Sequence, residues 1–303
     1  MTNDHDTFPS GTIAVTIPFP EGISFDRIPR AFCGRFQEIL GVPLTFANVT
    51  GGEGVAGAAH VAATEPDGYS LLVGSKGALT SHPHVEKSGY QPGDFAAIGQ
   101  FAEAPIALAV AALSPYQTLT DFLNAARQRP GALSYSTPNP RHTQHLAISE
   151  FAKREGIAFT FVEIAGGNPA AIEKVISGDI DFAFLGGHNY VDPVASGAVR
   201  VLGVAARDRV PFLPDQPTCL EQGVDLVTSI WLGLLTPKGT PESTLAVLRR
   251  AFDAAADDPA LRTEIESYRA VAAFLDHAAF QRRIDDDFER HGTVLRDMGM
   301  IGG

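Results

Sequence analysis

Apolar and polar residues first alternate and then recur at helical spacing within residues 11–40. Ile13, Val15 and Ile17 occupy every second position, which is the pattern of a half-buried strand. The chain then breaks at Pro18-Phe19-Pro20 and turns at Gly22. Apolar residues return every three or four positions, at Ile28, Phe32, Phe36, Ile39 and Leu40. The pattern predicts a strand, a tight loop and a helix in succession.

The start of this helix is a candidate anion site. Asp26 is a plausible N-cap, and this choice places Pro29 in the first helical turn, where its missing N–H costs nothing. The unpaired N–H groups and the positive dipole end of a helix N-terminus attract carboxylates. On this stretch alone, residues 19–26 are either half of a ligand cradle or an ordinary strand–helix connection whose cap is satisfied by itself.

The alternation of strand and helix continues to the end of the chain. Further strands are predicted at residues 44–49, 69–73, 95–101, 105–112, 133–136, 159–164, 181–185, 199–205 and 229–235. Helices are predicted at residues 55–63, 120–129, 143–154, 169–177, 241–256, 259–268 and 278–298. Two similar cycles of this kind predict an α/β fold of two lobes. We expect one lobe to comprise residues 1–108 and 228–303 and the other residues 109–227, with hinge segments near residues 107–112 and 228–234.

Composition narrows the class of protein. A chain of 303 residues, 45% hydrophobic and 19% charged, is long enough for two cores. The net charge of −12 argues against nucleic acid or an anionic membrane surface as a partner. Neither an apolar run of the roughly 18 residues that span a bilayer nor a signal-peptide pattern in residues 1–11 is found. Cys33 and Cys219 follow no metal or redox spacing, and whether they pair is open.

Motifs of other protein classes are present only in part. The pattern Gly52-x-Gly54-x-x-Gly57 matches a dinucleotide fingerprint, but it follows the second strand, and no acidic residue closes the next one. We interpret it as a turn that brings a helix close to the sheet. The histidine pairs lack the third and fourth ligands of a metal site. The row Asp285-Asp286-Asp287 is interpreted as a solvated helix face. We therefore expect no cofactor and no metal.

Four loops that follow predicted strands are small or polar, and each opens a helix. They lie at residues 19–26, 74–77, 137–143 and 166–168. Ligands of open α/β sheets bind outside the carboxyl ends of the strands. Two such loops in each lobe would face each other across a cleft suited to a small anion.

Several segments, in order, resemble the substrate-binding proteins of tripartite tricarboxylate transporters, called Bug proteins. The resemblance runs from about residue 8 to the C-terminus. It is carried by PFPEGISFD at residues 18–26, GAAHVA at 57–62, PDGYSLL at 66–72, PGALSYS at 130–136, LPDQPT at 213–218 and WLGL at 231–234.

The resemblance implies a periplasmic-binding-protein-like (Venus flytrap) fold, in which two α/β lobes joined by a hinge hold a carboxylate between them. It implies a protein that captures a small carboxylate-bearing metabolite for a transporter, with a small organic acid as ligand and membrane transporter subunits as possible partners. Carried over by position, the ligand-binding residues would be Phe19, Glu21, Gly22, Ser24, Asp26, Ser75, Lys76, Thr137, Asn139, His142, Thr143, Gly167, Asn168, Gly187 and His188.

Two loops depart from the family pattern. The usual Ala-Gly-Gly of the first loop is replaced by Glu21-Gly22-Ile23. Two like charges about 4 Å apart repel by about 4 kcal/mol at an effective dielectric constant near 20. Either Glu21 points away, or it is protonated, or the ligand carries a cationic or neutral group there. The loop at residues 137–142 gains two prolines, Arg141 and His142, so we expect a ligand other than a simple dicarboxylate.

The cellular compartment in which the protein acts is open, and a second function depends on it. The family acts outside the cytoplasmic membrane, so the chain is periplasmic if a leader has been removed and cytoplasmic if Met1 is the native start. A cytoplasmic member would be a ligand sensor or an enzyme, such as an isomerase or hydrolase of a small organic acid. A carboxylate and a histidine on opposite lobes could then move a proton. The candidates are Glu21, Asp26, Lys76, His142, His145 and His188.

Overall fold

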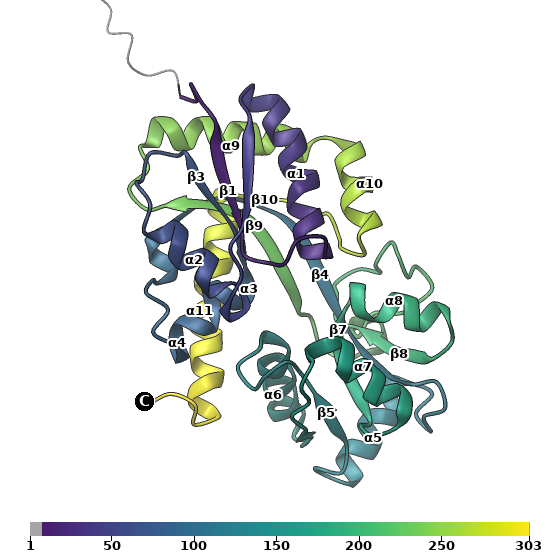
Figure 1. Ribbon diagram of the computed structural model, residues 1–303. Helices are drawn as coiled ribbons and strands as arrows, with labels where there is room; N and C mark the ends of the chain where they lie inside the picture. The colour runs from purple at the N-terminus through teal and green to yellow at the C-terminus, as the bar shows by residue number, and fades with distance from the viewer. Residues whose placement is uncertain (1–7, 303) are drawn as a thin grey trace, which may run out of the picture. The chain divides into compact units, whose positions relative to one another are not determined.

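The computed structural model describes residues 8–302 (Figure 1). Residues 1–7, which contain most of the stretch searched for a signal peptide, and Gly303 lie outside the described residues. The chain divides into two compact units. Unit 1 runs to Ala102 and adds Trp231–Tyr268 and Ala272–Gly292, whereas unit 2 comprises Glu103–Ile230, Arg269–Val271 and the chain from Thr293 onward. None of the described helices has the length and apolarity that a membrane crossing needs.

Unit 1 contains three parallel strands in the order β2-β1-β3, followed by the antiparallel strand β9. Their bounds are β1 (Ile13–Ile17), β2 (Leu44–Asn48), β3 (Ser70–Ser75) and β9 (Ser229–Pro237). The first part of β4 (Phe95–Ala111) pairs in this unit with β10 (Leu275–Asp276). Val15 stands opposite Phe46 on one side and Leu71 on the other. The carboxyl ends of all three parallel strands therefore lie at one edge.

The helices of unit 1 pack on this sheet and on each other. They are α1 (Ser24–Leu40), α2 (Val55–Ala62), α3 (Lys76–Thr80), α4 (His82–Val85), α9 (Glu242–Ala256), α10 (Pro259–Ser267) and most of α11 (His277–Asp297), whose residues from Thr293 belong to unit 2, with 3₁₀ turns η1 (Gly52–Gly54) and η2 (Pro92–Asp94). Helix α1 lies against α9 and α10 (Figure 1). Of its predicted apolar face, Ile28, Phe32 and Phe36 are buried and the last two positions, Ile39 and Leu40, are partly buried. The Phe32 ring stacks at 4.8 Å on Phe101 and lies tilted at 4.9 Å from Phe252.

Unit 2 is built in the same way around a second set of parallel strands. Strand β5 (Ser134–Ser136) pairs in parallel with β6 (Thr160–Phe161) and β7 (Phe182–Gly186). The second part of β4 pairs antiparallel with β7 and with β8 (Val199–Val204). The helices are α5 (Leu119–Gln128), α6 (Thr143–Glu155), α7 (Gly167–Ser177) and α8 (Gly187–Ala195), with the 3₁₀ turn η3 (Leu220–Gln222). Its core includes Leu185, Tyr190 and Val201.

Most elements lie where the hydrophobic pattern predicts them. The helices predicted at residues 143–154, 241–256, 259–268 and 278–298 are each found within one residue at both ends. The prediction of two short strands at 95–101 and 105–112 was wrong, because β4 is continuous. Pro105, which cannot donate to a ladder, falls between the residues paired with β10 and those paired with β7, so it interrupts neither.

The predicted start of the first helix was also wrong. Helix α1 begins at Ser24, with Ile23 as N-cap, so Asp26 lies in the first turn and Pro29 lies inside the helix. The chain turns earlier because Gly22 adopts φ 86°, a left-handed conformation that suits glycine, and its N–H donates to Asp26. Residues 74–77 likewise form no loop, since β3 ends at Ser75 and α3 begins at Lys76. Residues 186–189 include the start of α8.

Candidate functional site

The carboxyl edge of the unit 1 sheet brings two loops into close contact. Residues 18–23 follow β1, and the glycine-rich turn follows β2. A Cβ added at Gly57 would lie 2.7 Å from Cβ of Pro18, and one at Gly54 would lie 3.2 Å from Cβ of Ala78. Gly57 therefore allows α2 to approach the first loop, and Gly54 allows the turn before α2 to approach α3, in agreement with the packing interpretation of the Gly-x-Gly-x-x-Gly pattern.

Hydrogen bonds to the buried side chain of Asp26 hold the first loop, which comprises residues 18–23. The residue is 1% exposed, and Oδ2 accepts a hydrogen bond of 2.8 Å from Gly22 N–H. Oδ1 accepts from Arg30 Nε and from Asn48 Nδ2, each at 2.8 Å. Asn48 Nδ2 also donates to the carbonyl oxygen of Phe19 at 2.8 Å. Burial opposes ionisation, yet the donors at Gly22, Asn48 and Arg30 hold the pKa of Asp26 below its ordinary value.

These hydrogen bonds give Asp26 a structural role, because they fix the conformation of the loop. Arg30, which pairs with Asp26, also donates from Nη2 to Asn48 Oδ1 at 2.8 Å. Both carboxylate oxygens of Asp26 are thus engaged by the protein. The role of Asn48 was missed from the sequence, where a single Asn at a strand end carries no distinctive signal.

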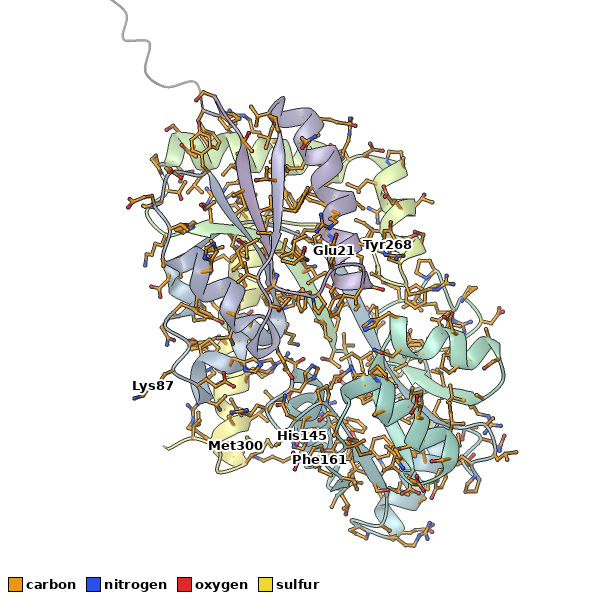
Figure 2. All side chains as sticks on the ribbon, viewed as in Figure 1. Glu21, Lys87, His145, Phe161, Tyr268 and Met300 are labelled. Atoms are coloured by element: carbon orange, nitrogen blue, oxygen red, sulfur yellow. The ribbon has the colours of Figure 1, made fainter. Side chains whose placement is uncertain are left out.

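The outer part of the same loop is exposed. Glu21 and Gly22 are exposed, and Figure 2 labels Glu21 on the loop. The rings of Phe19 and Phe25, both partly buried, lie 5.2 Å apart. Helix α1 begins at Ser24, so its N-terminus lies at this loop. The N-terminus of a helix favours the binding of a carboxylate.

The third strand end carries a buried ion pair. Ser75 is buried, and Lys76, 3% exposed, lies with Nζ 3.5 Å from Oδ1 of Asp287. Asp287 is 6% exposed and accepts from Trp231 Nε1 at 2.8 Å. The interpretation of residues 285–287 as a solvated face was therefore wrong for Asp287, although Asp285 and Asp286 are exposed. A helix periodicity of 3.6 turns one of three consecutive residues inward.

His82 joins the turn after β2 to α4. Its Nε2 lies 3.2 Å from Oε2 of Glu53, and its Nδ1 lies 3.2 Å from Oε1 of Glu86. Burial disfavours the charged imidazole, but the two carboxylates outweigh it and raise the pKa of His82. Glu53 adopts φ 54°, which is uncommon for a residue with a side chain. The sequence showed only a histidine pair at this place, and these partners were not predicted.

At the corresponding edge of unit 2, the loop after β5 is closed by its own side chains. Thr137 Oγ1 donates to the carbonyl oxygen of Asn139 at 3.0 Å, and Asn139 Oδ1 accepts from Arg141 N–H at 2.8 Å. His142 is the N-cap of α6, and its Nδ1 accepts from Gln144 N–H at 3.3 Å. Thr143 is buried at the first helical position.

His145 is part of the unit 2 core. Its Nδ1 lies 3.1 Å from the Tyr135 hydroxyl, and its ring meets Phe161 edge-on at 4.7 Å between ring centroids. Figure 2 labels His145 and Phe161. Burial, with a smaller effect of His142, lowers the pKa of His145 to about 4. The imidazole is therefore neutral near pH 7.

The remaining predicted residues of unit 2 lie at the starts of α7 and α8. Helix α7 begins at Gly167, which has φ 65°, and Asn168 follows it. Helix α8 begins at Gly187, where an added Cβ would lie only 2.5 Å from the carbonyl oxygen of Arg269. His188 is exposed, with Nε2 2.9 Å from Asn189 Nδ2. Buried polar atoms without a hydrogen-bond partner occur at Asn168 Oδ1, at the start of α7, and at both amide atoms of Gln144, in the first turn of α6. Gln144 was missed from the sequence.

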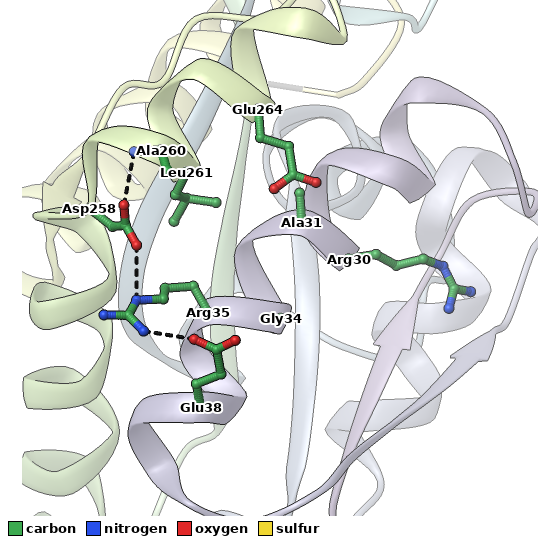
Figure 3. Close-up of a pocket in the computed structure, with 9 residues that line it drawn as sticks. All are labelled: Arg30, Ala31, Gly34, Arg35, Glu38, Asp258, Ala260, Leu261 and Glu264. Carbon is green, nitrogen blue, oxygen red and sulfur yellow. Dashed lines mark hydrogen bonds and ion pairs between the residues drawn. The ribbon is translucent and has the colours of Figure 1, made fainter.

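A pocket of about 320 Å³ lies elsewhere in unit 1, between α1 and α10 (Figure 3). Arg35 pairs there with Glu38 at 2.7 Å and with Asp258 at 3.0 Å. The Arg30 side chain extends away from this pair, toward its partners Asp26 and Asn48. The polar groups of the pocket thus largely satisfy each other, and the strand ends contribute no side chain to it. Among the described residues, no group of three His, Cys, Asp or Glu side chains is placed to hold a metal ion.

Comparison with known structures defines the class of protein. A solute-binding protein from Polaromonas superposes with a TM-score of 0.83 at 26% identity, covering 96% of this chain and 100% of that one. A Rhodopseudomonas palustris protein with adipate gives 0.80 at 25% identity, covering 96% and 98%. MatC from the same species, with bound malate, gives 0.75 at 25% identity, covering 95% and 100%. The chain therefore has the two-lobed α/β fold of periplasmic solute-binding proteins, as predicted.

The family follows from the sequence comparisons. The model of the tripartite tricarboxylate transporter family receptor, TctC, matches residues 28–300. An uncharacterised-family protein encoded between tcbD and tcbE in Pseudomonas sp. (strain P51) is 31% identical, covering 84% of this chain and 76% of its own length. Protein BugT of Bordetella pertussis is 26% identical, covering 97% and 91%. This chain belongs to the TctC family, and the predicted kinship with Bug proteins is confirmed.

Proposed function

We propose that this protein captures a small carboxylate-bearing metabolite and delivers it to a tripartite tricarboxylate-type transporter. In each unit, the parallel strands end at one edge, and each of these strands leads, directly or through a short loop, into the N-terminus of a helix; this single arrangement carries the proposal. The family is that of a transporter receptor, and two similar structures were solved with malate and adipate. The placement of the ligand between the lobes, the residues that bind it and the subunits that receive it stay predictions.

The contacts of three of the six acid–base candidates argue against proton transfer by those side chains. Asp26 is engaged by three donors, Lys76 is paired with Asp287, and His145 is bonded to Tyr135. A proton-transfer group must reach the proton it moves, within hydrogen-bond distance of the substrate. These three side chains hold structural contacts instead.

A thermal-shift screen with malate, adipate, succinate and benzoate tests the proposal. A ligand at 100 times its dissociation constant adds about 2.7 kcal/mol of stability, which is easily seen. Each hit is then incubated with the protein and examined by NMR. A carboxylate that stabilises the protein and is recovered unchanged supports the binding function. A hit that is converted to a product would favour the enzyme, and the absence of any carboxylate hit would contradict the proposal.

A further inference from the structure

Gln100 and Gln144 are both fully buried, but only one of them has partners for its side-chain amide. Gln100 lies in β4 and Gln144 in the first turn of α6, and each is 0% exposed. Gln100 Nε2 donates to the carbonyl oxygen of Ala273 at 2.9 Å, and Gln100 Oε1 accepts from Arg283 Nη1 at 2.8 Å. Neither amide atom of Gln144 has a hydrogen-bond partner among the described residues. Burying a polar group without a partner destabilises a protein, so the placement of Gln144 requires a reason outside the packing of unit 2.

The Gln144 side chain extends toward the carboxyl edge of the unit 2 sheet. His142 is the N-cap of α6, so Gln144 is the second residue of the helix. The side chains of a helix tilt toward its N-terminus, and no helical turn precedes this residue. Its amide is therefore directed past the end of α6, toward the loop at residues 137–142 that follows β5.

A second buried oxygen without a donor lies at the start of the next helix. Asn168 is the second residue of α7, and its Oδ1 has no partner among the described residues. Helix α7 follows β6, which pairs in parallel with β5. The ring of His145, the residue after Gln144, lies 4.7 Å from that of Phe161, the last residue of β6 (Figure 2). The two helices that carry the unpaired oxygens thus begin at the ends of neighbouring parallel strands.

These unpaired atoms restrict the chemistry of a ligand. An amide oxygen only accepts hydrogen bonds, and an ionised carboxylate has no hydrogen to donate. A carboxylate can pair with Gln144 Nε2 and with the N-terminus of α6, but it leaves Gln144 Oε1 and Asn168 Oδ1 without a donor. Arg141, the cation of the loop before α6, donates to neither oxygen in the structure. A hydroxyl, amino or carboxamide group of a ligand would supply the missing donor.

Burial of such a side chain agrees with the class of protein. Periplasmic binding proteins enclose their ligands by hinge closure, so the groups that bind the ligand are shielded from water. In such a site, a donor that reaches an unpaired oxygen gains the full strength of a buried hydrogen bond, because no water competes for the oxygen.

We propose that Gln144 determines ligand specificity, and that the ligand carries, besides its carboxylate, a hydroxyl, amino or carboxamide group that donates to Gln144 Oε1. The inference rests on the proposed function and names its ligand class. Gln144 Nε2 donates to an oxygen of the same ligand, and Asn168 Oδ1 is a second acceptor at this edge. The unpaired amide destabilises the free protein, and binding of the ligand removes this cost. A simple dicarboxylate, which has no donor, removes only part of it.

Isothermal titration calorimetry on the full chain tests the ligand class with two pairs of acids that differ in a donor. Malate is compared with succinate, which lacks the hydroxyl. Succinamate is compared with levulinate, in which a methyl group replaces the amide nitrogen. We expect the donor-bearing acid of at least one pair to bind about tenfold more tightly than its counterpart, the effect of one buried hydrogen bond.

Gln144→Met tests the residue, because it removes the amide and nearly keeps the length of the side chain. It should weaken the preferred acid about tenfold and bring its affinity to within about threefold of that of its counterpart. Since the amide has no partner in the free protein, the same variant should raise the melting temperature by about 2 °C.

Gln100→Met is the matched control, because it removes a buried amide whose two atoms are both paired. It should lower the melting temperature by about 4 °C and leave the preference between the two acids unchanged.

Binding without a preference for either donor-bearing acid would overturn the ligand class and leave the proposed function standing. The role of Gln144 would be overturned if Gln144→Met keeps the preference, fails to fold, or loses as much thermal stability as Gln100→Met, since the amide would then be paired within the protein. If none of the four acids binds while a carboxylate of the thermal-shift screen does, the inference fails alone. If no carboxylate binds, the proposed function fails with it.

Discussion

The Nζ atom of Lys76 lies 3.5 Å from Oδ1 of Asp287, and this buried pair joins α3 to α11. Burial lowers the pKa of Lys76 to about 8, against the raising effect of the Asp287 carboxylate. Burial would raise the pKa of Asp287, but Lys76 and Arg290 lower it to about 2. Because Lys76 follows directly on β3, the pair fixes the end of this strand at the carboxyl edge of the unit 1 sheet.

Asp287→Asn should therefore destabilise the protein by about 3 kcal/mol, because Lys76 is left as a buried charge with a weaker partner. Urea unfolding measures the change. The neighbouring Asp286→Asn, at an exposed position, should stay within about 0.5 kcal/mol of the parent. Adding Lys76→Met to Asp287→Asn should recover part of the loss. Equal effects of the two single aspartate variants would show that the pair is not a stabilising contact.

Asp26→Asn should loosen the first loop. The change weakens hydrogen bonds from Gly22, Arg30 and Asn48 to a charged acceptor, and such bonds contribute about 1.5–3 kcal/mol. We expect a loss of about 2 kcal/mol in urea unfolding and faster hydrogen exchange at Gly22 N–H. Glu21→Gln, in the exposed part of the same loop, serves as control and should change neither. Unchanged exchange at Gly22 would refute the assignment of Asp26 to loop shape.

His82 should make stability depend on pH in one direction. Its pKa is raised in the folded protein, so the stabilisation from Glu53 and Glu86 is complete below its ordinary value of 6.5 and is lost as pH rises through the folded pKa. The difference in unfolding free energy between the parent and His82→Gln should therefore shrink from pH 6 to pH 8.5. Taking this difference removes the contributions of the other histidines. His60→Gln, at an exposed position of α2, should give no such trend.

Cys33 and Cys219 should be unreactive until the protein unfolds. Both are buried free thiols, one in each unit, and burial raises the pKa of each to about 12. The thiolate is the reactive form, so a colourimetric disulfide reagent should find no thiol in the native protein and two in urea. Rapid labelling of the native chain would contradict this burial.

The sequence pattern predicted regular elements well because their signals are local. The alternation of Ile13 and Val15 with polar or small residues is visible in the linear sequence. The same holds for the three- and four-residue spacing of apolar residues in α9, α10 and α11. The first turn of α1 was misplaced because Gly22 and Asp26 meet through a side-chain bond that propensity does not encode. The prediction divided strand β4 in two because the sequence does not show that β4 pairs with β10 before Pro105 and with β7 after it.

By itself, the sequence determined the two-cycle α/β fold, its family and the presence of loops after the strands β1 and β5, because periodicity and motif order are properties of the linear chain. Only the tertiary structure decided which polar side chains those loops leave available. Asp26, Lys76 and His145 were candidates on residue type, and each is held by a partner far away in the sequence or buried in a core. Burial and pairing set the charge and reach of a side chain, and both depend on residues that folding brings together from distant parts of the chain.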